Sequence, residues 1–493
     1  MSGFPGVLPL SIDDTVSEYF GPISDFIVSV VFYSVTILGA DVSLIVLWLI
    51  GAAIFFTIWF GVPQIRHLPH SLNLVRGRFS KPEDAGEVSH FQALATAVSG
   101  TVGLGNIAGV AVAISLGGPG ATFWMIVAGF FAMASKMAEC TLGVMYRRRH
   151  ADGSVSGGPM YYLRDGVAKV SGNARLGKFL AAFFAVCCIG GSLGGGNMFQ
   201  ANQATAQIVS VTGGADSPFA DINWVIGLVF AVAVGAVIIG GIKSIARVTE
   251  KIVPFMAGIY VAACLIVIGG SIGQVPSAFG EIVSSAFSPA SVGGGFLGVL
   301  MVGFQRAAFS NEAGIGSASI AHSAVKTEEP ATEGFVAMLE PLIDTIIICT
   351  MTALTIVITG AWQDEEASEL GGVALTSSAF ESVIPWFPNV LALAVVLFAF
   401  STMISWSYYG MKATGYLFGD STTAEIVFKV IFCVFIVIGA ALSLKPVIGF
   451  SDAMIFSMSI ANVIGLYILA KTVRNEIRRH LGKVESGEFA RVK

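Results

Sequence analysis

The sequence predicts an all-α protein that crosses a membrane many times. Of its 493 residues, 55% are hydrophobic and only 12% are charged, and the mean hydropathy is +0.79. Soluble proteins carry about 25% charged residues, so this balance places most of the chain in a lipid bilayer. The apolar residues also gather into runs of about 20, the length that a membrane-spanning helix needs.

A window of about 19 residues divides the chain into about eleven spans. The predicted spans are 41–62, 92–115, 120–145, 179–210, 223–241, 252–272, 293–322, 334–360, 388–412, 425–442 and 447–471. The apolar segment from Ile23 to Leu38 is shorter, and we expect it to form a helix in the membrane interface.

The basic residues predict how these spans are oriented. Lys and Arg are absent from the loops 211–222, 273–291 and 361–387. They gather instead in the alternate segments, which are 66–81, 147–178, 243–251, Lys326 and 471–493. Because basic loops stay in the cytoplasm, we expect the N-terminal segment 1–40 outside the cell membrane and the tail 472–493 in the cytoplasm. The first forty residues lack the basic region of a signal peptide.

Cysteine and histidine are placed where an enzyme could not use them. All six cysteines fall in apolar segments without the spacing of a zinc site or a disulfide framework. Five of the six histidines lie in loops or tails, and His322 lies at the cytoplasmic end of a predicted span. The sequence therefore predicts neither a hydrolytic site nor a metal-dependent catalytic site at the bilayer centre.

The stretch SGTVGLGNIAG, from Ser99 to Gly109, weakens a span at its middle. Each glycine lowers helix stability by roughly 1 kcal/mol relative to alanine. A nucleotide-binding glycine loop needs a preceding strand and a βαβ unit, but this stretch lies between apolar membrane segments, so no nucleotide cofactor is expected. Two interpretations remain: close helix packing, or a deliberate break in the helix.

A second stretch, SNEAGIGSASI from Ser310 to Ile320, resembles the first. Gly314 and Gly316 take the places of Gly103 and Gly105. The two stretches lie five predicted spans apart and so cross the membrane in opposite directions, which is the pattern of an inverted repeat with paired broken helices. Chance similarity between two glycine-rich segments is the alternative.

A broken helix supplies the chemistry that an amino-acid site requires. Its free N–H groups and positive dipole end suit a carboxylate, and its free carbonyls suit an ammonium group or Na⁺. Gly103 and Gly105 leave no side chain between backbone and ligand. We expect Thr101 and Asn106 to add side-chain contacts to the substrate.

Several motifs together resemble one family. They are ALATAVSGTVGLGNIAG (93–109), GGPGATFWM (117–125), GGPMYYL (157–163), GGGNMFQAN (194–202), FQRAAFSNEAGIGSA (304–318) and SWSYYG (405–410). The chain is similar to the alanine or glycine:cation symporters from about residue 40 to 471.

The resemblance implies a LeuT-type fold with two repeats of five helices, 92–272 and 293–471, after an extra N-terminal helix at 41–62. It also implies Na⁺-coupled uptake of alanine or glycine by alternating access, with Na⁺ as coupling ion and no organic cofactor. We expect a monomer without a nucleic-acid partner. A proton-coupled symporter and a channel are the alternatives.

The same resemblance assigns further site residues. It implies a substrate contact from Gln200 and pocket walls from Trp406 and Phe304. It implies a sodium site in which Ser401 and Thr402 meet carbonyls near Ser99 and Val102. Without the family, the amides of span 179–210 could simply join helices, the hydroxyls could bond within their own helix, and the aromatic rings could be ordinary packing.

Ionisable residues inside the spans are expected to be functional. Arg306 and Glu312 flank the second break, and we expect them to pair with each other. An intramembrane Glu312 is also the basis of the proton-coupled alternative. Lys136 and Glu139 lie one helical turn apart, which predicts a local ion pair.

Overall fold

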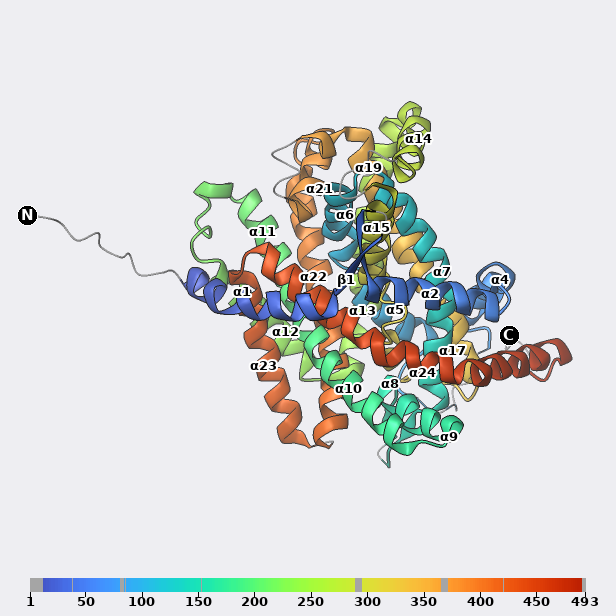
Figure 1. Cartoon of the computed structure of the whole chain (residues 1–493). Helices are drawn as coiled ribbons and strands as arrows, with labels where there is room; N and C mark the ends of the chain where they lie inside the picture. Colours follow the sequence, from blue (N-terminus) through green and yellow to red (C-terminus); the bar gives the residue numbers. More distant parts are fainter. Residues whose placement is uncertain are drawn as a thin grey trace, which may run out of the picture.

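The computed structural model describes residues 12–489 apart from 38, 80–83, 85, 152, 289–294, 365–370 and 420. Part of the predicted outer segment 1–40 and parts of the loops 273–291 and 361–387 therefore lie outside the described residues. Figure 1 shows a protein built almost entirely of helices.

The helices occupy the following ranges: α1 (Ile12–Val31), α2 (Leu44–Trp59), α3 (Pro63–Arg66), α4 (Leu68–Val75), α5 (His90–Thr101), η1 (Gly105–Gly109), α6 (Val110–Gly117), α7 (Gly120–Met145), α8 (Pro159–Tyr161), η2 (Tyr162–Val167), α9 (Ala168–Ser171), α10 (Ala174–Leu193), η3 (Gly194–Met198), α11 (Phe199–Val211), η4 (Gly214–Asp216), α12 (Asn223–Ile238), α13 (Gly241–Gly270), η5 (Ile272–Gln274), α14 (Val275–Ala286), α15 (Gly295–Asn311), α16 (Ala318–His322), α17 (Pro330–Ala337), α18 (Leu339–Pro341), η6 (Leu342–Cys349), α19 (Thr350–Thr359), η7 (Ala361–Gln363), α21 (Gly372–Glu381), α22 (Phe387–Phe418), α23 (Thr422–Ala441) and α24 (Leu444–Ser486). Two short antiparallel hairpins pair β1 (Ser34–Ile37) with β2 (Ala40–Ser43) and β3 (Arg148–Arg149) with β4 (Val155–Ser156).

The structure confirms a multi-pass membrane protein. Among the described residues, 7 helices are long and apolar enough to cross a membrane, and the bent pair made by α5 and the segment Gly105–Gly117 raises this to 8. Shorter apolar helices occupy Phe20–Val31, Leu44–Trp59 and Asn223–Ile238. Each predicted span therefore contains a helix. Their grouping into two repeats of five stays a prediction.

Helix α5 begins and ends at positions that the sequence explains. Its first turn is closed by a capping box in which Ser89 and Gln92 exchange side-chain and main-chain hydrogen bonds of 3.2 and 3.1 Å. After Thr101 the chain turns by 49° and resumes as the π-helical η1. This is the first break.

The second break, between α15 and α16, is held open by left-handed backbone. Gly314 and Gly316 have φ values of 85° and 95°, and Glu312 has a φ of 57°. Glycine takes such angles without the steric cost that other residues meet. Both glycine-rich stretches therefore interrupt their helices, and packing alone does not describe them.

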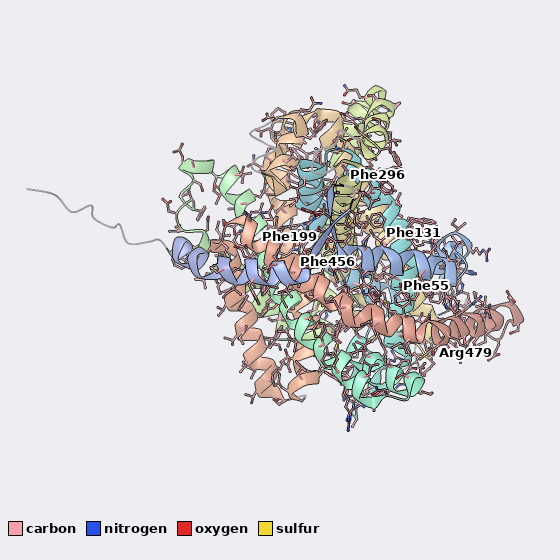
Figure 2. The ribbon with its side chains drawn as sticks, viewed as in Figure 1. Phe55, Phe131, Phe199, Phe296, Phe456 and Arg479 are labelled. Atoms are coloured by element: carbon pink, nitrogen blue, oxygen red, sulfur yellow. The ribbon has the colours of Figure 1, made fainter. Side chains whose placement is uncertain are left out.

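Helix α24 is the longest element and runs diagonally across the view in Figure 1 (red) to the C-terminus. The N-terminal helix α1 lies along it, where Ser24 donates to the carbonyl of Pro446 at 2.9 Å. The segment predicted as a cytoplasmic tail from residue 472 continues this helix to Ser486. Arg479 lies on its projecting end (Figure 2).

Candidate functional site

The first break is held by two amide side chains. The main-chain N–H of Gly103 donates to Oδ1 of Asn106 at 3.0 Å, and the N–H of Leu104 donates to Oε1 of Gln200 at 3.2 Å. These N–H groups lie at a helix interruption and have no α-helical partner, so the amides satisfy them. Asn106 is fully buried and Gln200 is 3% exposed. Gln200 thus reaches across from α11 to the break, where the family resemblance expected it.

Two neighbouring amides, Asn197 of η3 and Asn202 of α11, face elsewhere. Asn197 donates to the carbonyl of Phe432 at 2.7 Å. Asn202 donates to the carbonyls of Gly439 and Leu442 at 3.2 and 2.5 Å. Both therefore join their helices to α23 and its C-terminal end, which is the structural role that the sequence left open for the amides of span 179–210.

Helix α22 brings its hydroxyl groups against the same break. Thr402 donates to the carbonyl of Ser99 at 2.9 Å, and the hydroxyl of Ser99 donates to the carbonyl of Ser401 at 2.8 Å. A Cβ added at Gly103 would lie 2.4 Å from Oγ1 of Thr402, so only glycine allows this approach. The cluster supplies oxygen atoms alone, which is the donor type that hard cations prefer.

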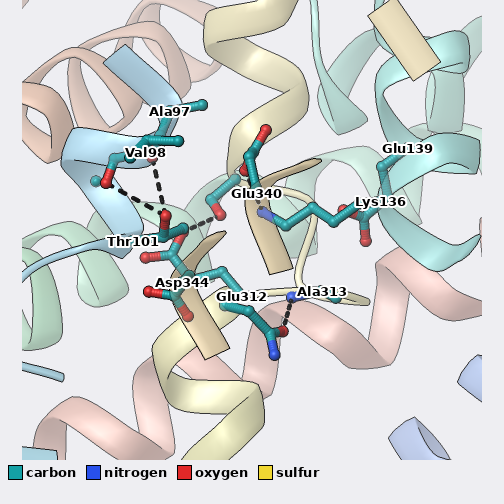
Figure 3. Close-up of polar contacts among 12 residues, drawn as sticks. Ala97, Val98, Thr101, Lys136, Glu139, Glu312, Ala313, Glu340 and Asp344 are labelled. Atoms are coloured by element: carbon teal, nitrogen blue, oxygen red, sulfur yellow. Dashed lines mark hydrogen bonds and ion pairs between the residues drawn. The ribbon is translucent and has the colours of Figure 1, made fainter. Parts of the chain in front are cut away.

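Two of the predicted hydroxyls bond within their own helices. Ser401 donates to the carbonyl of Phe398 at 3.0 Å. Thr101 bonds the carbonyls of Ala97 and Val98, both at 3.3 Å (Figure 3). This is the back-bonding that is common for Ser and Thr in membrane helices. The main chain of Val102 is tied to α5 through a 2.6 Å bond from its N–H to the carbonyl of Val98.

Trp406 links the first break to the second. Its indole N–H lies 3.3 Å from the carbonyl of Gly100 and 3.0 Å from Oε1 of Glu312. A Cβ added at Gly196 would lie 2.1 Å from Cγ of Trp406, so the glycine run of η3 makes room for the ring. Trp406 is 1% exposed and therefore forms an inner wall between the two interrupted helices.

Phe309 lies between the glycine-rich turns of η1 and η3. Its ring atoms would be 3.8 and 3.4 Å from Cβ atoms added at Gly105 and Gly195. Phe304 lies farther back on α15, against Trp124, with ring centroids 6.3 Å apart. Sequence reasoning singled out Phe304 and missed Phe309. The packing of Phe309 against Gly105 and Gly195 brings together three elements that are distant in the sequence. No pattern in the residues around Phe309 could therefore have predicted it.

Asp344 is the second residue that sequence reasoning did not assign to the site. Asn106 donates to its carboxylate at 2.6 Å, and Ser310 and Thr345 donate to it at 2.7 Å each. The side chain lies on the π-helical η6 and is fully buried beside both breaks (Figure 3). An acid inside a membrane span was the available signal.

The structure corrects both predicted ion pairs. Arg306 pairs with Asp452 of α24 and not with Glu312. Glu312 lies beyond the last residue of α15, so the helical spacing that would bring it beside Arg306 does not extend to it. Glu312, in left-handed backbone, turns its carboxylate to Ser317 and Trp406.

Lys136 pairs with Glu340 at 3.1 Å and not with Glu139. Glu139 instead accepts from Asn462 at 2.8 Å, and the same amide also donates to the carbonyl of Gly314 at 2.9 Å. Packing between helices therefore overrides the one-turn spacing on α7.

Two interrupted helices that converge on one buried polar site, in a chain with several spans, define a membrane transporter. The family model described as the sodium:alanine symporter family matches residues 25–493, and the chain belongs to that family. It is a Na⁺-coupled amino-acid symporter and not an enzyme.

The chain is also similar to individual named proteins over most of its length. The chain is 40% identical to the sodium/alanine symporter AgcS of Methanococcus maripaludis, over 88% of this chain and 95% of that protein. It is 32% identical to the probable sodium/glutamine symporter GlnT of Bacillus subtilis, over 90% of this chain and 89% of that protein. The crystal structure of MhsT in complex with L-phenylalanine aligns with 80% of this chain and 99% of that chain, at 16% identity and a TM-score of 0.49.

Proposed function

We propose that this protein imports small neutral amino acids, alanine or glycine, together with Na⁺ by alternating access. The observation that carries the proposal is the contact of Trp406 with both interrupted helices. A ring fixed between the two breaks would limit the size of the substrate side chain beside it. The relative named as an alanine symporter supports this choice of substrate.

In this proposal the first break holds the substrate. Gly103 and Gly105 would leave no side chain between the main chain and the substrate, and Asn106 and Gln200 hold the N–H groups of Gly103 and Leu104 in position. The remaining proposed substrate contacts are Thr101, Phe304 and Trp406, to which the structure adds Phe309.

The proposed sodium site lies where Thr402 meets α5. Its ligands would be the carbonyls of Ser99 and Val102 and the hydroxyls of Ser401 and Thr402. The hydroxyl of Ser401 would turn from the carbonyl of Phe398, which it now contacts at 3.0 Å, toward the ion. Bound Na⁺ would supply positive charge that joins α5 to α22.

The proposed arrangement in the cell follows from the charges of the loops. The N-terminus would lie outside the cell membrane and the C-terminus in the cytoplasm. The helices would form two inverted repeats, 92–272 and 293–471, and the protein would act as a monomer.

Uptake into proteoliposomes tests the function. Labelled alanine and glycine would be offered with an inward Na⁺ gradient or an inward proton gradient, imposed separately. We expect accumulation with the Na⁺ gradient, and uptake driven by protons alone would contradict the proposal. Asn106→Leu should abolish uptake in a folded, inserted protein, because it removes the contacts with both Gly103 and Asp344.

Proton coupling is a second candidate because of Glu312. Its carboxylate is 3% exposed and accepts from Trp406 at 3.0 Å, between the two breaks. A proton on the Glu312 carboxylate would lie beside the proposed substrate site and would take the place of Na⁺ as the coupling ion. Glu312→Gln separates the candidates: uptake that stays Na⁺-driven in this variant favours sodium coupling.

A further inference from the structure

Beside the second break lies a buried chain of ionisable side chains that the proposed site does not use. His90 and His322 each contact one carboxylate oxygen of Glu333. The other ring nitrogen of His322 lies 2.6 Å from Glu340, whose second oxygen lies 3.1 Å from Nζ of Lys136. These side chains are at most 4% exposed. Lys136 and Glu340 are drawn in Figure 3.

The geometry of His322 fixes the number of protons. A neutral imidazole donates from one nitrogen and accepts at the other. Here Nδ1 faces Glu333 and Nε2 faces Glu340, so two ionised carboxylates can both be satisfied only by the doubly protonated ring. The two positive charges of His322 and Lys136 then balance the charges of Glu333 and Glu340. If His322 loses one proton, one of its ring nitrogens becomes an acceptor that faces a carboxylate oxygen, which is also an acceptor, in a buried position.

These ionisable side chains connect five helices on the predicted cytoplasmic side of the breaks. His90 begins α5, His322 ends α16, Glu333 and Glu340 lie on α17 and α18, and Lys136 lies on α7. Beside these side chains, the main chain before α5 pairs with the main chain after α16, where the N–H of Glu87 donates to the carbonyl of Ala324 at 2.7 Å. Opening a path to the cytoplasm between α5 and α16 would separate His90 from His322.

The charged and titratable groups around His322 come from the neighbouring helices. They are His90 of α5, Lys136, Glu139 and Cys140 of α7, Glu333 of α17, Glu340 of α18, Glu312 of the second break, Tyr162 of η2, Tyr409 of α22, and Arg147, which donates to the carbonyl of Ser323. Cys140, His322 and Glu340 have ligand atoms within 4.8 Å of one another, which is close enough for a metal ion. Both nitrogens of His322 are already directed at carboxylates, however, and Lys136 places an ammonium group on Glu340. The chemistry therefore favours a proton over a metal ion.

We propose that His322 and its two carboxylates form a proton-binding site, and that the bound proton holds the cytoplasmic half of the transporter closed. This inference rests on the proposed alternating access and orientation. A proton taken from the cytoplasm onto His322 completes both contacts and stabilises the closed form. Loss of that proton as cytoplasmic pH rises weakens the contacts and favours opening. Because proton binding and opening are thermodynamically linked, the ratio of the closed to the open form changes by up to about tenfold per pH unit when one proton is exchanged.

The test measures opening directly and without substrate. Val88 is 3% exposed beside α16, so a Val88→Cys protein should react slowly with a thiol reagent when closed and faster when open. Rates would be compared at about pH 6 and about pH 8, in protein with and without His322→Gln. Comparing the two proteins at the same pH cancels the ionisation of the introduced thiol.

We expect labelling of the His322 protein to be several-fold slower than that of the His322→Gln protein at the lower pH, with the two rates converging at the higher pH. His150→Gln is the matched control, because His150 contacts Ser156 at 2.9 Å and does not belong to the row of ionisable side chains around His322. It should leave the pH response intact. Glu333→Gln gives a second variant if His322→Gln does not fold, and it should also remove the response.

A response that persists in both folded variants would overturn the proposal, as would stoichiometric Zn²⁺ bound by the purified protein and lost in His322→Gln. Na⁺-driven uptake at one fixed pH is measured in parallel. Intact uptake without the pH-dependent labelling counts against the proton site alone. Labelling that responds to His322 in a protein without Na⁺-driven uptake counts against the proposed function alone.

Discussion

Thr402 and Ser99 hold α22 and α5 together through main-chain and side-chain atoms at once. The Thr402 hydroxyl lies 2.9 Å from the Ser99 carbonyl, and the Ser99 hydroxyl lies 2.8 Å from the carbonyl of the residue before Thr402. Two oxygens this close can both contact one cation if the hydroxyl turns its proton away. The contact therefore brings the proposed sodium ligands together in advance.

Thr402→Val should weaken the apparent affinity for Na⁺ by about tenfold, because a lost polar contact of this kind costs roughly 1–2 kcal/mol. The affinity for alanine at saturating Na⁺ should change much less. Both are measured from uptake into proteoliposomes. Thr414→Val, on the same helix, is the control, since Thr414 bonds only the carbonyl of Gly410 at 2.8 Å. Equal losses of Na⁺ and alanine affinity would contradict the sodium site.

Gly103→Ala and Gly109→Ala form a matched pair within one glycine-rich stretch. The added Cβ at Gly103 would meet Oγ1 of Thr402 at 2.4 Å, whereas at Gly109 it would meet nothing within 4 Å. We expect Gly103→Ala to reduce uptake by at least about tenfold, the equivalent of 1.4 kcal/mol. Gly109→Ala should keep near-normal uptake. Similar losses in both variants would show that helix propensity, and not the approach of Thr402, decides the effect.

Asp452→Asn should lower the thermal stability of the detergent-solubilised protein. Arg306 and Asp452 are each about 4% exposed, and removing one partner of a buried pair costs roughly 3–5 kcal/mol. The double variant Arg306→Met with Asp452→Leu should recover much of the loss, because it buries no unpaired charge. Tm values from thermal unfolding check both. A double variant as unstable as Asp452→Asn would mean that the pair is needed beyond its charges.

Glu329 should make the thermal stability of the protein depend on pH in the acidic range. His480, whose Nδ1 lies 3.9 Å from the Glu329 carboxylate, together with the bonded Lys483 and Arg479, lowers the pKa of Glu329 from 4.5 to about 2. Because the folded pKa lies below the unfolded one, the carboxylate stabilises the fold above about pH 4.5, and this contribution disappears as pH falls through about 2.

Glu329→Gln should therefore lower the Tm at neutral pH, and its difference from the unsubstituted protein should shrink between these two pH values. Glu328→Gln is the control, because that side chain is 51% exposed in its pair with Arg149. A difference that stays constant with pH would show that the carboxylate charge of Glu329 does not contribute.

The spans and the two breaks could be predicted because their signals are local. Hydropathy located a helix in each predicted span, although it missed α14 and α21 in the predicted loops 273–291 and 361–387, and the glycines of 99–109 and 310–320 marked the interruptions. Gln200 and Thr402 could be named from the family resemblance, and the structure places both against the first break.

The pairing of charges could not be predicted, because it depends on which helix faces which. Glu340, 204 positions after Lys136 in the chain, competes successfully with Glu139 one turn away. Likewise, Arg306 pairs with Asp452 of α24, although Glu312 is much nearer in the sequence. The π-helical turns are likewise invisible to hydropathy, although η1, η3 and η6 set the positions of Asn106, Gly196 and Asp344.

Helix α24 has a mechanical consequence. It is unbroken for 43 residues, about 65 Å at 1.5 Å per residue. Along that length it contacts Arg306 through Asp452, Gly314 through Asn462, and Glu329 through Lys483. A stiff lever of this length that tilts by about 2° moves its far end by about 2 Å. A tilt that displaces the Arg306–Asp452 pair would therefore also displace the C-terminal end of α24 and the contact of Asn462 with the second break between them.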